Sequence, residues 1–326
     1  MEHFTAYEQQ VIREIAKHTI DPNMIEGALR KIGAPTEYVI KKIQKNNNDL
    51  VKKVTNKINQ TVANGAKKAI KAANHLCSDQ SIIAEYQKKG ISIKDYGEVK
   101  KATLHEMDMV ADSCDFSNAV YIGLEGVVFA TATTIAEGTG VGVLAIPTLI
   151  GIDVASSLTL LSRNVCQIAT SYGYSSQDPA NLPYLLTAMT PQSHGDEGGY
   201  LASKAAVINA SYEAQKFMGK NIGQVFNDGN LAKQAPRLLH IINSLAQRLN
   251  IIITEKELGM LVPLAGILMN AGTNVAFQQS SHRNAKDYFR RLTLENRYRD
   301  EIVAKAIKSE IEKLRNTSEC YNTQVI

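Results

Sequence analysis

The segment from Gly138 to Asn164, GTGVGVLAIPTLIGIDVASSLTLLSRN, constrains the fold most, because it is largely apolar yet carries charged residues. A helix that crosses a bilayer needs about 20 mostly apolar residues. Only 15 uncharged residues separate Glu137 from Asp153, Pro147 interrupts them, and Arg163 follows. A charged side chain at the bilayer centre costs about 2.5–3.5 kcal/mol. We therefore expect this segment to fold against other helices rather than to cross a membrane.

A second apolar stretch, from Leu258 to Phe277, has no charged residue over 20 positions, but Pro263, Asn270 and Asn274 interrupt it. Asparagine side chains need hydrogen-bond partners in hydrocarbon. A packed core helix is therefore favoured over a membrane span. The sequence leaves open whether the apolar hairpins lie in a soluble core or insert into a membrane surface.

Small residues recur in both apolar stretches and in the helix that precedes the first one. Small side chains let helix backbones approach closely, so we expect tightly packed helical hairpins. The positions are Gly123, Gly126, Ala130, Ala132, Ala136, Gly138, Gly140, Gly142, Gly151, Ala155, Gly266, Ala271 and Gly272.

The remaining sequence is typical of an all-α protein. Eight prolines in 326 residues are few, and Ile251–Thr254 is the only strand candidate. We predict a multi-helix bundle in which long amphipathic helices surround Gly/Ala-rich central helical hairpins. A single domain, 1–326, would contain N-terminal helices (1–36), a basic amphipathic helix (37–76), the Gly/Ala-rich hairpin (118–174), C-terminal helices (200–300) and a charged tail (301–326). Within it we expect helices at 200–218 and 230–249, and one from 262 to 300 that continues into the tail.

Positive charge is concentrated between Lys41 and Lys71, where nine lysines accompany one acid, Asp49. Such a helix suits anionic lipid headgroups, at about 1 kcal/mol per lysine near the surface. A solvated lysine-rich face is the simpler alternative. Nucleic acid is disfavoured, because arginine and interleaved aromatic residues are missing there. The lysines are Lys41, Lys42, Lys45, Lys52, Lys53, Lys57, Lys67, Lys68 and Lys71.

Three ionisable residues fall in the apolar hairpin region: Glu125, Asp153 and Arg163. A buried charge is tolerated when it is paired, so we predict an ion pair of Arg163 with one of the two acids. The sharper alternative is a polar cleft, completed by Asn270 and Asn274, in which a carboxylate acts as acid or base.

Motifs for metal, cofactor and nucleophile chemistry are incomplete. HEMD, at 105–108, lacks the second histidine of a zinc helix and is interpreted as a polar helix face. EGTGVG, at 137–142, is not followed by the Lys-Ser/Thr of a phosphate loop, and no GxSxG elbow occurs. The four cysteines lie far apart and form no CxxC motif. We therefore expect reduced thiols, as in a cytoplasmic protein. We expect no metal and no cofactor, and the sequence identifies no catalytic residue.

Several segments together resemble the EcsC family. DVASSLTLLSRNVCQIATSYGY (153–174) resembles its hallmark helix, and LEGVVFATATTIAEGTGVG (124–142) the segment before it. LVPLAGILMNAGTNVAF (261–277) and DYFRRLTLENRY (287–298) are similar to its C-terminal helices. The resemblance implies an all-helical fold and a membrane context, since the family is named for a gene beside an ABC transporter linked to secretion. It implies no reaction.

These observations lead to one expected function and two alternatives. We expect a cytoplasmic accessory protein, peripheral on the inner membrane face or bound to lipid, with a membrane-protein partner such as a transporter. The first alternative is a hydrolase-type enzyme that uses Glu125 or Asp153 as a buried carboxylate. The second is a soluble binding module whose charged helix, Asp300–Arg315, docks on another protein.

Overall fold

The computed structural model describes residues 4–20, 78–113, 163–189, 197–220, 225, 230–241 and 265–323. Every regular element within these ranges is a helix, which confirms the predicted all-α fold. The basic segment, the hairpin up to residue 162 and the strand candidate at 251–254 lie outside the described residues. Predictions on those segments, and the division of the chain into parts, stay predictions.

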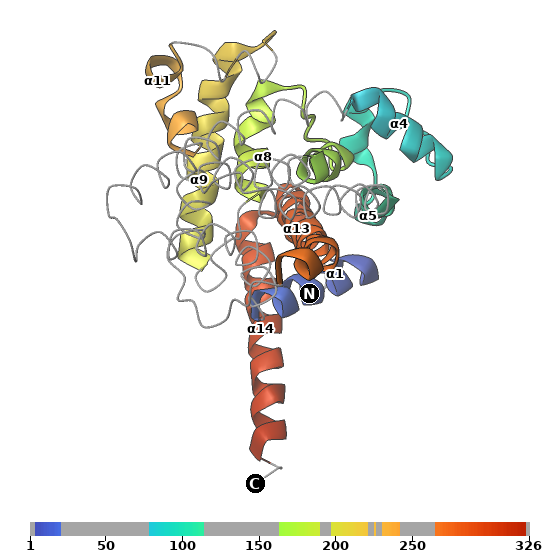
Figure 1. The fold of residues 1–326 in the computed structure, drawn as a ribbon. Helices are drawn as coiled ribbons and strands as arrows, with labels where there is room; N and C mark the ends of the chain where they lie inside the picture. Colours follow the sequence, from blue (N-terminus) through green and yellow to red (C-terminus); the bar gives the residue numbers. More distant parts are fainter. Residues whose placement is uncertain are drawn as a thin grey trace.

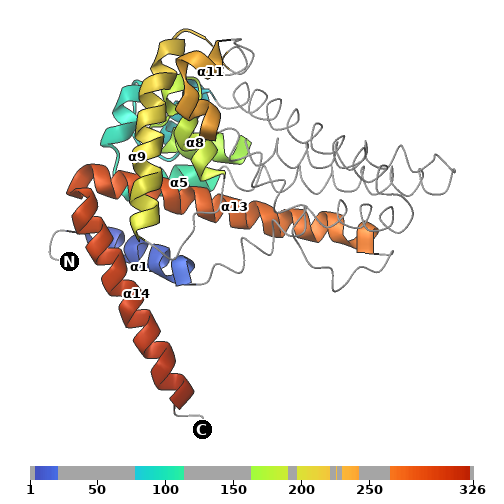
Figure 2. The ribbon, with the colours of Figure 1, turned by 90° about the vertical axis from the view of Figure 1, so that its left-hand side faces the viewer.

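The long helix α13 (Ala265–Tyr298) organises the described part of the chain. It contacts α1, α5, α8 and α14, and Figure 2 shows it between the α5, α8 and α9 group on one side and α1 with α14 on the other. Phe289, Leu292 and Leu294 on α13 are buried in the hydrophobic core. A polar residue on this helix can therefore meet partners from several elements at once.

The elements before residue 114 follow local signals in the sequence. Helix α1 (Ala6–Ile20) and helix α5 (Leu104–Ser113) both begin with a T-x-x-E motif. In each, the threonine and glutamate satisfy one another's backbone N–H groups, as Thr103 and Glu106 do. Between them, α4 (Asp79–Lys88) ends before Gly90, where φ is +78°, and η1 (Tyr96–Lys101) leads into α5. The positive φ of Gly90, which glycine adopts readily, suits the end of α4.

The middle of the chain forms a second group of helices. The end of the hallmark segment is helical over 163–171, followed by η2 (Pro179–Asn181) and α8 (Leu182–Ala188). Helix α9 (Glu197–Ala214) continues into η3 (Gln215–Phe217), close to the predicted helix at 200–218. Figure 1 shows α8, α9 and α11 (Leu231–Gln234) together on the side of the molecule away from α14.

The prediction of one continuous helix at 230–249 is wrong. Helix α11 ends at Gln234, Ala235 adopts φ −141° and ψ 64°, and the helix resumes at 236–241. The residue before a proline is pushed out of the helical region by the proline ring. Pro236 therefore separates α11 from the helix described over 236–241.

The prediction that the helix at 262–300 continues into the tail is also wrong. The chain turns at Arg299, a non-glycine residue with a positive φ of +70°. Helix α14 (Asp300–Thr323) follows the turn and runs in a different direction from α13. Lys204 Nζ bridges the turn, at 2.7 Å from both Glu295 Oε2 and Asp300 Oδ1. Acidic residues at the start of α14 suit the positive end of its dipole.

Helix α14 packs its apolar side against α1. Val303, Ala306 and Ile307 are buried there, and Arg13 Nε lies 3.9 Å from Glu310 Oε2. Figure 1 shows the later turns of α14 extending beyond the other described helices. None of the described helices is both long and apolar enough to span a bilayer.

Candidate functional site

The structure describes few of the side chains predicted to form a site. Glu125, Asp153 and all nine lysines of the basic segment lie outside the described residues. Asn270 and Asn274 are placed on the helical backbone of α13 without described side chains, and Arg163 is the first described residue of the helix over 163–171. The predicted Arg163 ion pair and the predicted polar cleft therefore stay predictions.

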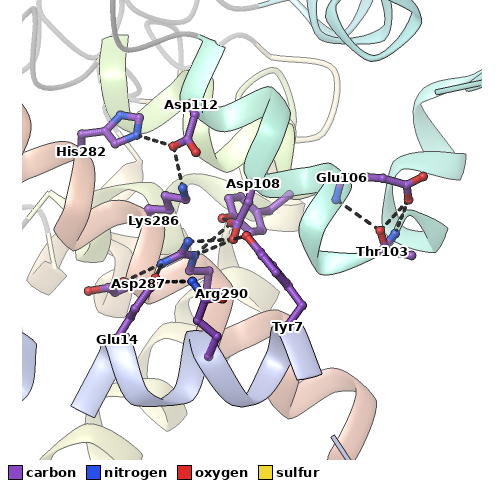
Figure 3. Close-up of polar contacts among 12 residues, drawn as sticks. Tyr7, Glu14, Thr103, Glu106, Asp108, Asp112, His282, Lys286, Asp287 and Arg290 are labelled. Carbon is purple, nitrogen blue, oxygen red and sulfur yellow. Dashed lines mark hydrogen bonds and ion pairs between the residues drawn. The ribbon is translucent and has the colours of Figure 1, made fainter. Parts of the chain in front are cut away.

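A different set of polar residues meets in the core, where α5 crosses α13. Asp108 on α5 and Arg290 on α13 have side chains that are 2 % and 7 % exposed. Arg290 Nε donates to both Asp108 oxygens, at 3.0 and 2.9 Å, and Nη2 lies 2.8 Å from Oδ2 (Figure 3). A guanidinium that contacts both oxygens of a carboxylate gives a strong and directional ion pair.

Two tyrosine hydroxyls complete the coordination of Asp108. Tyr7 on α1 donates to Oδ2 at 2.5 Å, and Tyr172 donates to Oδ1. Burial, followed by the nearby Asp108 carboxylate, raises the pKa of Tyr172 well above its usual value. Both tyrosines therefore act as hydrogen-bond donors, and the carboxylate is held by three elements.

The same guanidinium also binds α1. Arg290 Nη1 lies 2.9 Å from Glu14 Oε2 and 3.4 Å from Asp287 Oδ1. Asp287 in turn is 2.6 Å from His18 Nδ1. One arginine thus connects α1, α5 and α13.

A second contact lies one helical turn along α5 and α13. Lys286 Nζ and His282 Nε2 are 2.6 and 3.4 Å from Asp112 Oδ1. Partial burial of Asp112, whose side chain is 58 % exposed, opposes ionisation, but the hydrogen bonds from His282 and Lys286 outweigh it and lower the pKa of Asp112 to about 2. Acids spaced by four on α5 therefore face bases spaced by four on α13.

A third cluster surrounds Glu8 on α1, whose side chain is 4 % exposed. Arg297 Nη1 lies 3.2 Å from Oε1, and the Tyr298 hydroxyl donates to Oε2 at 2.8 Å. Thr5 donates its backbone N–H to the same oxygen at 2.9 Å. Burial alone would raise the pKa of Glu8, but the hydrogen bonds from Thr5, Tyr298 and Arg297 lower it below 4.5.

Glu8 should make the fold sensitive to acid. Because its folded pKa is below 4.5, its ionised form stabilises the fold above about pH 4.5 and this contribution is lost as the pH falls through the folded pKa. We expect Glu8→Gln to lower the free energy of unfolding by about 1–3 kcal/mol near neutral pH and by less at about pH 3. Urea unfolding at both pH values measures this difference.

Glu106→Gln is the matched control, because Glu106 occupies the same position of a capping box. Its hydrogen bonds in the described chain go to Thr103 alone. We expect a small effect that is equal at both pH values. A Glu8→Gln penalty that does not shrink in acid would contradict the assignment of Glu8.

Sequence reasoning missed these clusters. HEMD was interpreted as a polar helix face, which holds for exposed His105, whereas Asp108 is buried at 1 % exposure. The signal that could have found it is the spacing: Asp108 and Asp112 share one face of α5, as His282, Lys286 and Arg290 share one face of α13. Spacing alone does not say that the two faces meet.

The chemistry of these clusters is that of structural ion pairs. Each buried carboxylate described above has a cation within hydrogen-bond distance, and such pairing stabilises the ionised forms. Within the described ranges no three histidine, cysteine, aspartate or glutamate side chains gather as a metal site would require. The described clusters therefore position helices.

Fold and site together define an all-helical protein whose central C-terminal helix is fastened to three other helices by buried ion pairs. Comparison with protein-family models matches residues 25–292 to the EcsC protein family. Since the match covers most of the chain, the protein belongs to the EcsC family. Searches of curated proteins and of solved structures found no match.

Proposed function

We propose that this protein is a peripheral membrane accessory protein that binds anionic lipid through the segment from Lys41 to Lys71. The observation that carries the proposal is the distribution of charge. The segment has nine lysines and one acid, a surplus of eight positive charges, whereas the whole chain has a net charge of +4. The other residues together therefore carry −4, so the net attraction of the chain to an anionic surface is concentrated in this segment.

The ion-paired carboxylates Glu8 and Asp112 are poorly suited to acid–base catalysis at neutral pH. A general acid or base at neutral pH works best with a pKa near 7. Glu8 and Asp112 have lowered pKa values instead, because cations contact them. The hydrolase alternative consequently rests on Glu125 and Asp153, which lie outside the described residues.

The alternative of a soluble binding module is weakened, because part of the helix surface that it assigns to a partner is buried within the chain. It assigns the helix Asp300–Arg315 to a partner protein, but Val303, Ala306 and Ile307 of that helix are buried within the chain itself. An amphipathic helix docks through its apolar face, and here much of that face is occupied by α1. We propose a location on the cytoplasmic membrane face, in keeping with the naming of the family for a gene beside an ABC transporter.

Vesicle co-sedimentation tests the proposal. The full chain is mixed with phosphatidylcholine vesicles, with or without phosphatidylserine, over a series of salt concentrations. We expect binding that requires phosphatidylserine and weakens as salt is added. Combined Lys52→Gln, Lys53→Gln and Lys57→Gln should lower the partition coefficient roughly a hundredfold, at about 1 kcal/mol per lysine.

The matched control changes three exposed lysines elsewhere, Lys101, Lys305 and Lys308, to glutamine. It alters the net charge equally but should leave vesicle binding almost unchanged. Binding that ignores both phosphatidylserine and salt, or an equal loss in the control, would refute the proposed function.

A further inference from the structure

A tight turn ends the α9 and η3 helices. Lys220 N–H donates to the Phe217 carbonyl at 2.9 Å, Met218 has φ −53° and ψ 136°, and Gly219 has φ +83°. These values define a type II turn, whose third residue needs a positive φ and is therefore usually glycine. The backbone thus fixes Met218 at the apex.

The turn buries one apolar side chain and exposes the next. Phe217 is fully buried, whereas Met218 is 68 % exposed and Tyr212, on the last turns of α9, is 64 % exposed. A side chain added at Gly219 would meet no atom within 4 Å, so the apex is open. The core anchors the turn through Phe217, and nothing among the described residues covers Met218.

Cationic side chains surround the apex. Exposed Lys216 and Lys220 flank it in the sequence, and Lys216 Nζ donates to the Gln234 carbonyl at 2.8 Å, which fastens the end of α11 beside it. That neighbouring segment contributes exposed Lys233 and Arg237. Both views show α11 beside the end of α9 (Figures 1 and 2).

The region around the turn has a positive net charge, whereas the chain outside the segment from Lys41 to Lys71 has a negative one. Residues 212–241 contain four lysine and arginine residues and two acids. One of the acids, Glu213, pairs with Arg237 at 3.3 Å. By contrast, exposed Ile302 on α14 directly follows two acids, Asp300 and Glu301.

We propose that Tyr212 and the turn Lys216–Lys220 form a second membrane contact, in which Met218 enters the interface of an anionic bilayer and the lysines bind headgroups. The inference rests on the proposed function and adds a surface on the folded body to the basic segment. Apolar side chains combined with cations are what an anionic interface recognises, because the apolar group leaves water while the charges stay at headgroup level. An acidic protein partner would match the cations but gains less from Met218.

The chain contains no tryptophan, so a single introduced one reports its own surroundings. Met218→Trp is mixed with phosphatidylserine-containing vesicles whose acyl chains carry bromine. We expect its fluorescence to shift to shorter wavelength and to be quenched. Ile302→Trp, an exposed apolar position beside acids, is the control and should show neither change. Equal signals from the two tryptophans, or none from Met218→Trp while the protein is bound, would overturn the inference.

Binding measurements separate this inference from the proposed function. Lys216→Gln combined with Lys220→Gln should weaken vesicle binding roughly thirtyfold. Met218→Ser, which removes an exposed side chain, should weaken it about tenfold with unchanged thermal unfolding. Lys305→Gln combined with Lys308→Gln should have little effect. Wild-type binding that the turn variants leave intact overturns the inference alone. If the turn variants lose binding but the variants of the basic segment do not, the proposed role of Lys41–Lys71 fails and the inference stands.

Discussion

Replacing Arg290 with methionine is expected to lower the free energy of unfolding by about 3–5 kcal/mol. The reason is that the substitution removes the cation that pairs with Asp108. This carboxylate is only 2 % exposed, and Arg290 contacts it through Nε and Nη2. Removing one partner of a buried pair leaves an uncompensated charge in a medium of low polarity. The change also removes the contact to Glu14 that connects α1. Urea unfolding of the full chain measures the effect.

Three further variants identify the cause. Arg290→Lys keeps the charge but cannot contact both carboxylate oxygens in the same way, so we expect an intermediate loss. Adding Asp108→Asn to Arg290→Met removes both charges and should recover part of the stability. Arg315→Met, on an exposed position of α14, should change stability by less than about 0.5 kcal/mol. An Arg290→Met penalty as small as that of Arg315→Met would contradict the structural role of the pair.

This expectation could not have been drawn from the sequence near Asp108. The local context, His105 to Asp108, is polar and suggests a solvated helix face. The burial of Asp108 depends on α13, which contributes Arg290 from 182 positions away. A charged residue in an apolar stretch, such as Asp153, attracts attention, whereas a charged residue in a polar stretch that tertiary packing buries does not. The resemblance of DYFRRLTLENRY to a family helix pointed to the correct segment but gave Arg290 no role.

The fold was more predictable, because helix type depends on local signals. The T-x-x-E capping boxes, the break at Gly90 and the apolar spacing of α1 are all readable in order along the chain. The two errors concern interruptions. Pro236 interrupts its segment for a local reason, since a proline inside a helical pattern ends or kinks the helix.

The turn at Arg299 is harder to foresee, because the helical pattern continues across it and no glycine or proline marks it. A change from basic residues, Arg297 and Arg299, to acidic ones, Asp300 and Glu301, is typical of one helix ending and another beginning. The positive φ of Arg299 costs energy that tertiary contacts must offset. The contacts of Glu295 and Lys204 across the turn provide such an offset.

Glu295→Gln should therefore lower the free energy of unfolding by about 3–5 kcal/mol. The Glu295 side chain is fully buried and accepts hydrogen bonds from Lys204 Nζ at 2.7 Å, Arg291 Nε at 2.9 Å and the Tyr200 hydroxyl at 3.0 Å. Although burial disfavours a charged lysine, hydrogen bonds to Asp300 and Glu295 raise the pKa of Lys204, so the cation stays. A glutamine has one acceptor oxygen for these donors and turns an amide N–H₂ toward cations.

The loss of local stability should be largest at the turn between α13 and α14, which Lys204 bridges through Glu295 and Asp300. We expect the backbone amides of α14 to exchange hydrogen faster in Glu295→Gln than in the wild type. Those of α5 should change less, because the described side chains that contact Glu295 and Lys204 come from α9, α13 and α14. Glu312→Gln, at an exposed position of α14, is the control for the change of charge and should leave both unfolding and exchange unaltered. If Glu295→Gln unfolds like Glu312→Gln, the turn at Arg299 is stable without the network, and its offset must come from the packing of α14 on α1 instead.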